Sequence, residues 1–418
     1  MSSIFLYRRT SCRLCESFNL ESVFKLADSP PAEWFFQPNH SKSSLIKYPL
    51  ELFFCLNCFH VQLLDVLSPE SLFCEYFYTS QSSPGLQMHF KKFANKIVAD
   101  LNLNSQDLAV DIGSNDGTLL KEFKFHNVRV AGIEPSLDLA AMCESEGIPV
   151  SKNFLNKESV DEILKQFGPA RLVTANNVFA HNDDLFTMLL NIKTLLASNG
   201  IFVFEVSSLY EMIKCKVFDW IYHEHLSYHS LISLIPFLKK AGLEIRKVEY
   251  ILTKGGSMRV YATHRGSLET LHDEDSIEKQ VNLELSYGLN KSETFKKFAA
   301  EINNRGKILR NELTRIKKNR RTIVGFGASA TTTTLLFHFE LLPFLEFLVD
   351  DNPIRWGTLV PGTNLMVKKP TELEKLHNFD VLITAWRFES TIRNQYSKKI
   401  KMRGGRFLVP LPEFNIFN

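Results

Sequence analysis

Short apolar runs that alternate with amphipathic segments dominate the middle of the chain. The run LAVDIG at 108–113 precedes the stretch SNDGTLLKEFK at 114–124, and a second apolar run, VRVAGIEP, follows at 128–135. Apolar runs of this length favour buried strands, and a strand, a helix and a strand in succession form a βαβ unit with parallel strands. The pattern therefore predicts that a parallel sheet begins near residue 108.

The alternation continues to residue 264. Helices are expected at 184–198 and 230–242, and four more strands are expected from RLVTANNV (171–178), GIFVFEV (200–206), LEIRKVEYI (243–251) and GSMRVYATH (256–264). The turn Lys254-Gly255-Gly256 suits a hairpin, so the last two strands are expected to be antiparallel. With a third strand just before Phe154, five parallel strands are expected, and five such strands closed by a hairpin are typical of the seven-stranded sheet of class I methyltransferases. We therefore expect an α/β fold with a Rossmann-like domain at its centre.

The pattern on either side of this sheet predicts two further domains. A helix is expected before the sheet, with apolar residues at helical spacing, namely Leu86, Phe90, Phe93 and Ile97. A charged helical region at 266–320 precedes a second α/β unit, in which a strand at 321–327 leads into a G-x-G-x-x-A turn. Asp350 and Asp351 follow the next apolar run, and later strand regions are expected at 385–390 (AWRFES) and 406–414 (RFLVPLPEF).

Length and composition agree with several globular domains. A chain of 418 residues is too long for one ordinary core, and the patterns divide it into 1–80, 81–265 and 266–418. The net charge of +3 is too small for a nucleic-acid-binding surface. The N-terminal residues lack an apolar core of signal-peptide length, and the most apolar later stretch is broken by His338, Glu340, Pro343 and Glu346. We expect a cytoplasmic protein with no membrane, nucleic-acid or obligatory protein partner.

Four of the seven cysteines form two C-x-x-C pairs, Cys12 with Cys15 and Cys55 with Cys58. Each pair can present two thiolates to one tetrahedral Zn²⁺, and iron is the alternative metal. The 39 residues between the pairs are more than a compact zinc ribbon uses, so a segment there must loop out. A Cys₄ site has no open position, so the metal is expected to be structural. Buried free thiols are expected at the other three positions, Cys74, Cys143 and Cys215.

The turn after the first central strand has the pattern G-x-N-D-G, from Gly113 to Gly117. It is not the G-x-G-x-x-G of dinucleotide-binding proteins, and it places Asp116 where a pyrophosphate would need backbone N–H groups. S-adenosylmethionine has no phosphate and carries a sulfonium and an amino group, so it suits the acidic turn with Asp111 better. Glu134 ends the second strand, where a carboxylate can accept hydrogen bonds from a ribose diol.

The segment Tyr222-His223-Glu224-His225 joins a phenol, two imidazoles and a carboxylate. Such groups suit proton transfer, because the pKa of an imidazole is about 6.5. Side chains alternate along an extended segment, so His223 is expected to turn away from Tyr222 and Glu224 and to be structural. The tyrosines at 76 and 78 either reach over a pocket or join the small domain to the next one.

The motifs also support a resemblance to a known family. Two C-x-x-C pairs, VDIGSNDGTLL, GIEPS, ANNVFAH, FDWIYHEHLSYHS, GGSMRVY, GFGAS and VDDNPIRWGTLVPGT occur in the order seen in the sugar C-methyltransferase family. The chain resembles that family over essentially its full length, which implies a zinc-binding domain, an S-adenosylmethionine domain and a C-terminal Rossmann-like domain. The implied substrate is a nucleotide sugar, namely a 4-keto-deoxyhexose linked to a nucleoside diphosphate, dTDP in known members, and methylated on carbon 3.

The resemblance also implies roles for individual residues. His225 is the expected base, and the other expected active-site residues are Tyr222, Glu224, His181 and Tyr76. The expected cofactor contacts are Asp111, Gly113, Asn115, Glu134, Phe154, Asn176 and Asn177. The C-terminal domain is expected to help hold the sugar nucleotide, and the helix N-terminus after its glycine turn can meet a diphosphate.

The chain departs from the family pattern in its C-terminal domain. Members often have Lys-Gly after GFGAS and Asn after AW, whereas this chain has Ala330-Thr331-Thr332 and Ala385-Trp386-Arg387. The residues that choose the nucleotide or the sugar therefore differ. Three alternatives remain at this point: an O- or N-methyltransferase, a nicotinamide-dependent oxidoreductase that uses the C-terminal turn, and a non-catalytic binding protein.

Overall fold

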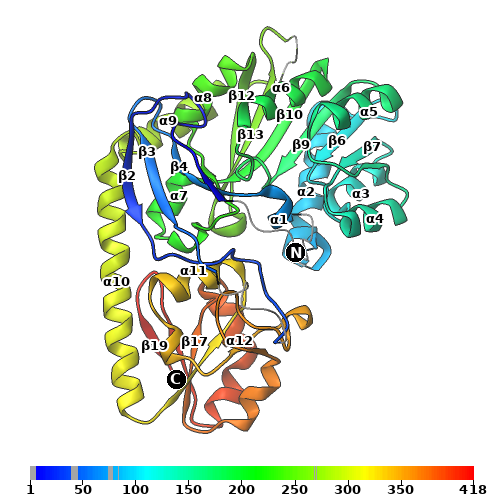
Figure 1. Cartoon of the computed structure of the whole chain (residues 1–418). Helices are drawn as coiled ribbons and strands as arrows, with labels where there is room; N and C mark the ends of the chain where they lie inside the picture. The colour runs from blue at the N-terminus through cyan, green and yellow to red at the C-terminus, as the bar shows by residue number, and fades with distance from the viewer. Residues whose placement is uncertain (1–5, 39–45, 74–78, 83, 268, 270) are drawn as a thin grey trace.

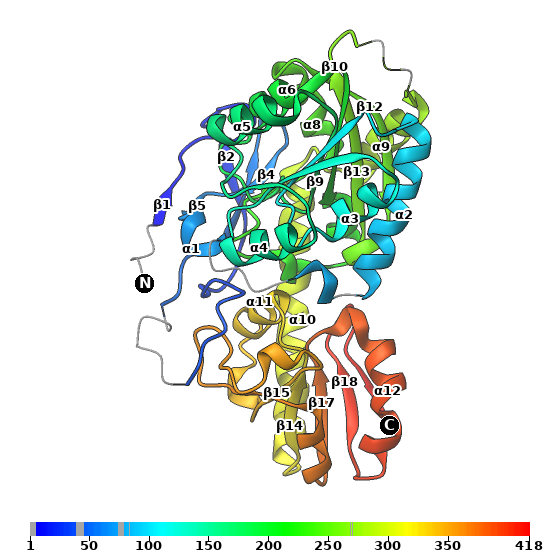
Figure 2. The same cartoon turned by 90° about the vertical axis from the view of Figure 1, so that its right-hand side faces the viewer.

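The computed structural model describes residues 6–38, 46–73, 79–82, 84–267, 269 and 271–418. These residues form three parts (Figure 1): a central sheet covered by helices, a small N-terminal sheet beside it, and a C-terminal sheet below both. The long helix α10 (Ser292–Lys318) runs past the small sheet and along the C-terminal part. The view in Figure 2 shows that the C-terminal part lies under the central part.

The central sheet has the strand order β12-β13-β10-β9-β6-β7-β8 within the described residues. Neighbouring strands from β8 to β10 are parallel, and β13 is antiparallel to both β10 and β12. The strands are β6 (Leu108–Ile112), β7 (Arg129–Ile133), β8 (Val150–Ser151), β9 (Ala170–Asn176), β10 (Leu196–Ser207), β12 (Leu243–Ile251) and β13 (Ser257–His264). The predicted class I methyltransferase sheet, with five parallel strands and a closing hairpin, is confirmed.

Helices pack on both faces of this sheet. Three of them contribute to the apolar core on one face: α2 (Pro84–Leu101), α3 (Thr118–Phe125) and α4 (Leu137–Ser145). Three others cover the opposite face: α5 (Lys157–Phe167), α6 (Leu185–Leu195) and α8 (Leu231–Lys240). The predicted spacing in α2 holds, because Phe90, Phe93 and Ile97 are buried on the side that meets the sheet.

The N-terminal sheet includes a strand from the middle of the chain. Its order is β11-β4-β3-β2, where β11 comes directly after the Tyr222–His225 segment. The strands are β2 (Leu20–Lys25), β3 (Glu51–Cys55), β4 (Val61–Leu63) and β11 (Ser227–Tyr228), and β1 (Leu6–Arg8) pairs with β5 (Asp65–Leu67) nearby, just before the short helix α1 (Pro69–Phe73). The pairing of β11 with β4 therefore fixes the Tyr222–His225 segment against the cysteine-bearing part.

The C-terminal sheet has the order β16-β15-β14-β17-β18-β19 within the described residues. Its elements are β14 (Thr322–Phe326), α11 (Ala330–His338), β15 (Leu348–Val349), β16 (Val367–Lys368), β17 (Phe379–Ile383), α12 (Glu389–Lys401), β18 (Arg406–Val409) and β19 (Asn415–Phe417). Helix α9 (Glu274–Ser286) instead packs on α8 and β12 of the central part. The predicted strand at 385–390 is wrong. The buried run FDVLI just before it forms β17, and Trp386–Phe388 is a 3₁₀ helix that leads into α12.

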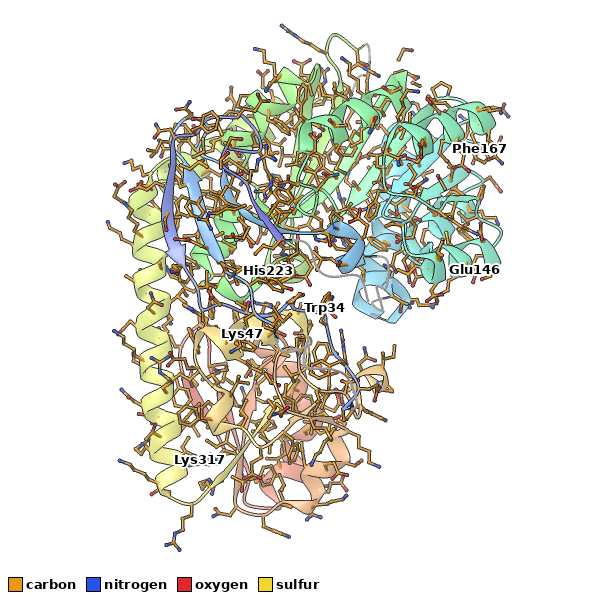
Figure 3. All side chains as sticks on the ribbon, in the orientation of Figure 1. Trp34, Lys47, Glu146, Phe167, His223 and Lys317 are labelled. Carbon is orange, nitrogen blue, oxygen red and sulfur yellow. The ribbon has the colours of Figure 1, made fainter. Side chains whose placement is uncertain are left out.

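Residues 26–38, which we name the strap, leave the N-terminal sheet and reach the C-terminal part. Phe36 forms an antiparallel bridge with Leu359, and the Thr333 hydroxyl donates to the Ala32 carbonyl at 3.1 Å. Figure 3 shows Trp34 of the strap and Lys47 at the junction of the upper and lower parts. The segment between the two C-x-x-C pairs thus loops out, as predicted, and joins the domains.

No helix among the described residues is both long enough and apolar enough to cross a membrane.

Candidate active site

The two C-x-x-C pairs come together at the end of β3. In each pair the residue after the second cysteine, Glu16 or Phe59, has a positive φ and donates its backbone N–H to the carbonyl of the first cysteine at 2.9 Å. These tight turns point both sulfur atoms of a pair to the same side.

The four cysteine sulfur atoms lie within 4.8 Å of one another. The distance from Cys12 to Cys58 is 3.5 Å, and that from Cys15 to Cys55 is also 3.5 Å. Thiolates bound to zinc at about 2.3 Å in a tetrahedron stand about 3.8 Å apart, so the four sulfur atoms fit this ion. Protein sulfur fills every coordination position, which gives the metal a structural role.

The other cysteines differ from the prediction in one case. Cys143 is buried, and its sulfur lies where a side chain at Gly117 would clash, at 2.7 Å from an added Cβ. Cys215 is exposed, so the prediction of a buried thiol is wrong there: it follows the last residue of α7 (Leu209–Lys214) and faces solvent beside Glu211. Cys74 lies outside the described residues.

The turn between β6 and α3 has an unusual backbone. Gly113, Asn115 and Gly117 all have positive φ, a region that glycine and asparagine tolerate best. The N–H of Gly113 donates to the Ile133 carbonyl at 2.8 Å, and an added Cβ at Gly113 would lie 2.5 Å from Val178 Cγ2. The turn therefore approaches the segment after β9 too closely for any side chain.

Glu134 stands beside this turn in a fixed orientation. One carboxylate oxygen accepts from the Asn115 N–H at 2.9 Å, and the other accepts from the Ser136 N–H at 2.9 Å. Burial raises the pKa of Glu134, although these two hydrogen bonds oppose the shift. Each oxygen keeps a lone pair, so the carboxylate can still accept from a ribose diol, as S-adenosylmethionine requires.

Asp111 lies deeper, near the end of β6. Its carboxylate accepts from the Thr174 hydroxyl at 2.5 Å, and burial raises its pKa to about 8. A cationic ligand nearby would favour the ionised form. The acidic pair Asp111 and Glu134 thus suits the sulfonium and amino groups of S-adenosylmethionine and does not suit a pyrophosphate.

Residues just before α2 cover the turn. The N–H of Ser80 donates to Asn115 Oδ1 at 2.9 Å, and the N–H of Gln81 donates to Asp116 Oδ2 at 2.8 Å. The predicted loop residues Tyr76 and Tyr78 lie outside the described residues. Ser80 and Gln81, which follow them in the chain, nevertheless contact the cofactor turn.

The remaining expected cofactor residues also lie at the carboxyl ends of parallel strands. Phe154 follows β8 and is half-buried, Asn176 is the last residue of β9, and Asn177 follows with a positive φ. Ligands of open α/β sheets bind at this edge.

His225 has a defined tautomer. Its Nδ1 lies 2.9 Å from the Trp220 carbonyl oxygen, which can only accept, so Nδ1 carries the proton. Nε2 lies 3.1 Å from the Tyr222 hydroxyl. In a neutral ring Nε2 therefore holds the lone pair, and the Tyr222 hydroxyl donates to it.

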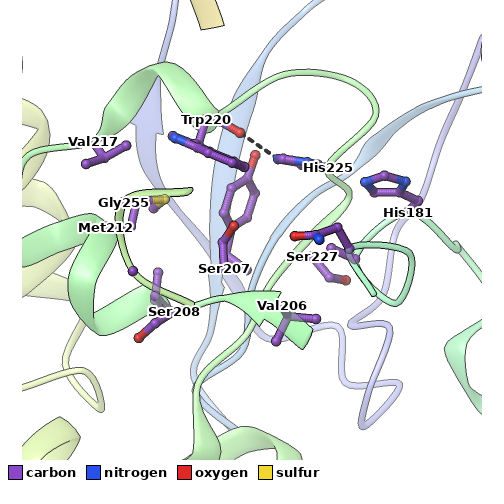
Figure 4. Close-up of a pocket in the computed structure, with 15 residues that line it drawn as sticks. His181, Val206, Ser207, Ser208, Met212, Val217, Trp220, His225, Ser227 and Gly255 are labelled. Atoms are coloured by element: carbon purple, nitrogen blue, oxygen red, sulfur yellow. Dashed lines mark hydrogen bonds between the residues drawn. The ribbon is translucent and has the colours of Figure 1, made fainter. Parts of the chain in front are cut away.

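Aromatic rings enclose His225 (Figure 4). Its ring stacks on Trp220, with centroids 5.5 Å apart and an angle of 15°, and on His181, with centroids 5.1 Å apart and an angle of 24°. Phe73 stacks on the far side of His181 at 5.4 Å. A pocket opens beside these rings, and its wall includes Asn177, His181, Ser208, Met212, Trp220, His225 and Gly256.

The other two residues of the segment point elsewhere. His223 is buried, its Nε2 donates to the Pro49 carbonyl at 3.1 Å, and burial lowers its pKa to about 4, so it turns away as predicted. Glu224 faces the strap, where one of its oxygens lies 3.4 Å from the Glu33 N–H. Burial raises the pKa of Glu224 to about 7. No hydrogen bond between Glu224 and His225 occurs in the described structure.

The glycine turn of the C-terminal part already holds carboxylates of the chain itself. Asp350 accepts from the Ala328 N–H at 2.6 Å, and Glu33 of the strap accepts from the Ala330 N–H at 3.1 Å. Glu33 also forms an ion pair with Arg355, whose guanidinium lies 3.9 Å from the centroid of the Phe35 ring. A diphosphate at this helix N-terminus would have to displace Glu33.

Trp220 and Glu33 were not among the predicted site residues. Trp220 belongs to the motif FDWIYHEHLSYHS, so its place two residues before Tyr222 could have signalled a site residue. Glu33 had no such signal, because its partners Ala330 and Arg355 lie about 300 residues away along the chain.

Three family models match successive parts of the chain. "Putative zinc binding domain" matches residues 12–73, "Methyltransferase domain" matches 89–248 and "C-methyltransferase C-terminal domain" matches 252–412. The chain is also similar to C-methyltransferase NovU of Streptomyces niveus, with 28% identity over 407 residues that cover 96% of this chain and 95% of the relative.

Solved structures resemble the central part. A magnesium protoporphyrin IX methyltransferase from Synechocystis covers 43% of this chain and 80% of its own, with 15% identity and a TM-score of 0.33. An S-adenosylmethionine-dependent methyltransferase from Clostridium acetobutylicum covers 42% and 91%, with 14% identity and a TM-score of 0.35. Scores this low add nothing to the strand order of the sheet, which itself defines the fold class.

The strand order, the Cys₄ cluster, and a relative and three family models that span the chain agree with one another. The chain belongs to the C-methyltransferase family and is an S-adenosylmethionine-dependent C-methyltransferase with an N-terminal zinc-binding domain.

Proposed function

We propose that the chain methylates carbon 3 of a 4-keto-deoxysugar linked to a nucleoside diphosphate, with dTDP as the nucleotide. The observation that carries this proposal is the tautomer of His225, whose Nδ1–H is held by the Trp220 carbonyl. A neutral imidazole with its Nε2 lone pair at the edge of a pocket is equipped to take a proton. Methyl transfer to a carbon needs such a base.

The chemistry follows from the acidity of a carbon beside a ketone. His225 Nε2 removes the proton from carbon 3, and the electrons of that C–H bond move into an enolate with the 4-keto oxygen. A donor at this oxygen stabilises the negative charge that develops on it. When bound, S-adenosylmethionine would supply the electrophilic methyl group to carbon 3, and the electron pair of the broken S–CH₃ bond would stay on sulfur as the thioether of S-adenosylhomocysteine.

Tyr222 is proposed to donate to the enolate oxygen. Its hydroxyl lies 3.1 Å from His225 Nε2, so one substrate can contact both groups when its carbon 3 and its 4-keto oxygen replace this hydrogen bond. Carbon 3 and the 4-keto oxygen are both bonded to carbon 4 of the substrate. They therefore lie close together, as His225 Nε2 and the Tyr222 hydroxyl do in the site. This arrangement makes Tyr222 and His225 an acid and base pair for enolisation.

His181, Glu224 and Tyr76 are proposed to complete the site. His181 stacks on His225 and restricts the plane of the imidazole, and it borders the same pocket. Glu224 holds the strap at the Glu33 N–H, so its role is proposed to be the closure of the site by the strap. Tyr76 lies outside the described residues, and its role in the reaction stays a prediction from the family resemblance.

The cofactor is proposed to lie along the carboxyl edge of the central sheet. Glu134 would accept from the ribose hydroxyls, and Asp111 would face the charged end of the molecule. The residues Gly113, Asn115, Asn176 and Asn177 would line this edge, and Phe154 would cover the adenine. The orientation of Glu134 by two backbone N–H groups supports this placement.

The position of the transferred methyl group tests the proposal. The enzyme is incubated with ¹³C-methyl S-adenosylmethionine and 4-keto-6-deoxysugars linked to dTDP, GDP, CDP or UDP, and the products are examined by NMR. The account predicts a ¹³C–¹³C or ¹³C–¹H correlation that places the methyl group on carbon 3 of the dTDP sugar. A methyl group on oxygen or nitrogen, or no product with any of the four sugars, would refute it.

A further inference from the structure

A buried carboxylate connects the C-terminal part to the catalytic segment. Asp219 is fully buried, and one of its oxygens accepts from Arg387 Nη1 at 2.8 Å while the other accepts from Trp386 Nε1 at 2.9 Å. Asp219 belongs to the 3₁₀ helix Phe218–Trp220 of the central part. Both donors belong to the 3₁₀ helix Trp386–Phe388, which follows β17 of the C-terminal sheet.

The residue after Asp219 is the one that fixes His225. The Trp220 carbonyl accepts the Nδ1 proton of His225, and the Trp220 ring stacks on the imidazole. Trp220 also contacts Arg387, whose guanidinium carbon lies 5.3 Å from the centroid of the Trp220 ring. Trp220 is therefore in contact with His225 and with the cation that pairs with Asp219.

We propose that Asp219, Trp386 and Arg387 are positioning residues for His225. They hold the 3₁₀ helix Phe218–Trp220 so that the Trp220 carbonyl keeps the proton on Nδ1 and leaves the Nε2 lone pair for the substrate. The inference rests on the proposed function, in which His225 is the base. It also gives Arg387, a residue of the C-terminal part, a role in completing the catalytic segment of another domain.

The charges of the cluster give the proposal a specific signature. Among the described residues, the titratable groups that contact His225 include Tyr222 on its own segment and His181 on the segment after β9, while Glu224 and Glu33 meet on the strap side. The C-terminal part contributes the charge of Arg387, which pairs with Asp219 of the central part. Removal of one partner leaves the other charge buried and uncompensated beside Trp220.

The two single variants should therefore shift the acid limb of the pH profile, where His225 becomes protonated, in opposite directions. Arg387→Gln leaves the Asp219 carboxylate, which favours the imidazolium and moves the acid limb of the pH profile to higher pH. Asp219→Asn leaves the Arg387 cation, which moves the limb to lower pH. The double variant removes both charges and returns the limb to its wild-type position. A role that is only structural would lower the rate in all three variants without this pattern.

The experiment measures proton–deuterium exchange at carbon 3 of the dTDP-linked 4-keto-6-deoxysugar against pH. We expect opposite shifts in the two single variants and an exchange rate reduced by ~10- to 100-fold, the range by which outer partners of functional histidines act in metal sites. Arg387→Lys keeps the charge and should leave the limb unchanged. Arg393→Gln is the control, since Arg393 lies on α12 of the same part and pairs with Glu389 instead.

Three results would overturn the inference. If Arg387→Gln and Asp219→Asn keep the exchange rate and the acid limb of the wild-type pH profile, the cluster does not act on His225. Selective ¹⁵N-histidine NMR of the wild-type enzyme provides a test without any variant, because a proton on Nε2 of His225 would contradict the assigned tautomer. Exchange that persists in His225→Ala would overturn the proposed function as well. Loss of exchange in His225→Ala, with Arg387→Gln and Asp219→Asn unaffected, would overturn only the positioning role.

Discussion

The burial of Glu224 predicts a measurable pH dependence of stability. Burial raises the pKa of this carboxyl to about 7 from its ordinary value of 4.5. The folded chain therefore binds a proton that the unfolded chain has lost between these two values. Stability falls as pH rises through this window, because the folded chain must give up the proton or bury the charge.

The size of the effect follows from the two pKa values. A difference of about 2.5 corresponds to about 3 kcal/mol, at about 1.36 kcal/mol per unit of pKa. Glu224→Gln cannot ionise and still offers an oxygen to the Glu33 N–H. We predict that this variant gains about 2–3 kcal/mol of unfolding free energy relative to wild type between pH 5 and pH 8. Any change in unfolding free energy that the amide causes equally at all pH values cancels, because the comparison is between pH 5 and pH 8.

Chemical denaturation followed by tryptophan fluorescence measures the effect, with wild type and variant compared at pH 5, 6, 7 and 8. Glu278→Gln on α9 is the control, because this side chain is exposed and its surroundings change little on unfolding. A free-energy difference between wild type and Glu224→Gln that stays constant with pH would refute the reasoning. A difference that grows towards low pH would show that the folded carboxylate is stabilised and not penalised.

Three further predictions concern the other parts of the chain. Removal of zinc by chelation should lower the melting temperature and abolish methyl transfer, because the cysteine-bearing sheet holds β11 and with it the Tyr222–His225 segment. If neither the melting temperature nor the activity recovers after zinc is restored, this prediction is contradicted. Glu33→Gln should lower the unfolding free energy by about 1.5–3 kcal/mol, the range for hydrogen bonds to charged groups, as measured by the denaturation midpoint. The exposed pair of Lys157 and Asp161 is its control, and equal midpoints in Glu33→Gln and wild type would refute the prediction. Gly113→Ala should weaken S-adenosylmethionine binding by ~5- to 100-fold in calorimetry, since strain of about 1–3 kcal/mol arises from the positive φ and the clash with Val178. Gly168→Ala has a similar φ in open space and should bind normally.

The central fold was predictable because its signals are local. Each apolar run in the middle of the chain became a strand, and the glycines of the first turn adopted the positive φ that their residue types favour. The Cys₄ cluster was predictable for the same reason, since the spacing within each pair fixes a tight turn. The pairing of the two turns across 39 residues needed only the chemistry of one metal ion.

The contacts between domains were not predictable. The strap reaches α11, and Asp219 meets Trp386 and Arg387, through side chains that are separated by more than 150 residues. No periodicity carries such information. The segment AWRFES was predicted as a strand, but its Trp386 bonds to Asp219 and its Arg387 lies over the Trp220 ring, and neither pairs with a neighbouring strand. The prediction that Cys215 is buried was wrong for a similar reason, because the burial of this residue depends on where a helix ends.

The candidate site was predictable in its residues and not in its geometry. The Tyr222–His225 segment pointed to proton transfer, and the alternation of side chains correctly turned His223 away. The sequence did not reveal that Glu224 faces the strap or that the Trp220 carbonyl sets the tautomer of His225.

The central claim is that His225 removes a proton from carbon 3 of the sugar. Proton–deuterium exchange at that carbon, measured without S-adenosylmethionine, tests it most directly in wild type, His225→Ala and the control His223→Gln. The account predicts exchange in the wild type and the control and none above background in His225→Ala. Exchange at the wild-type rate in His225→Ala, with the protein folded and its zinc retained, would contradict the account.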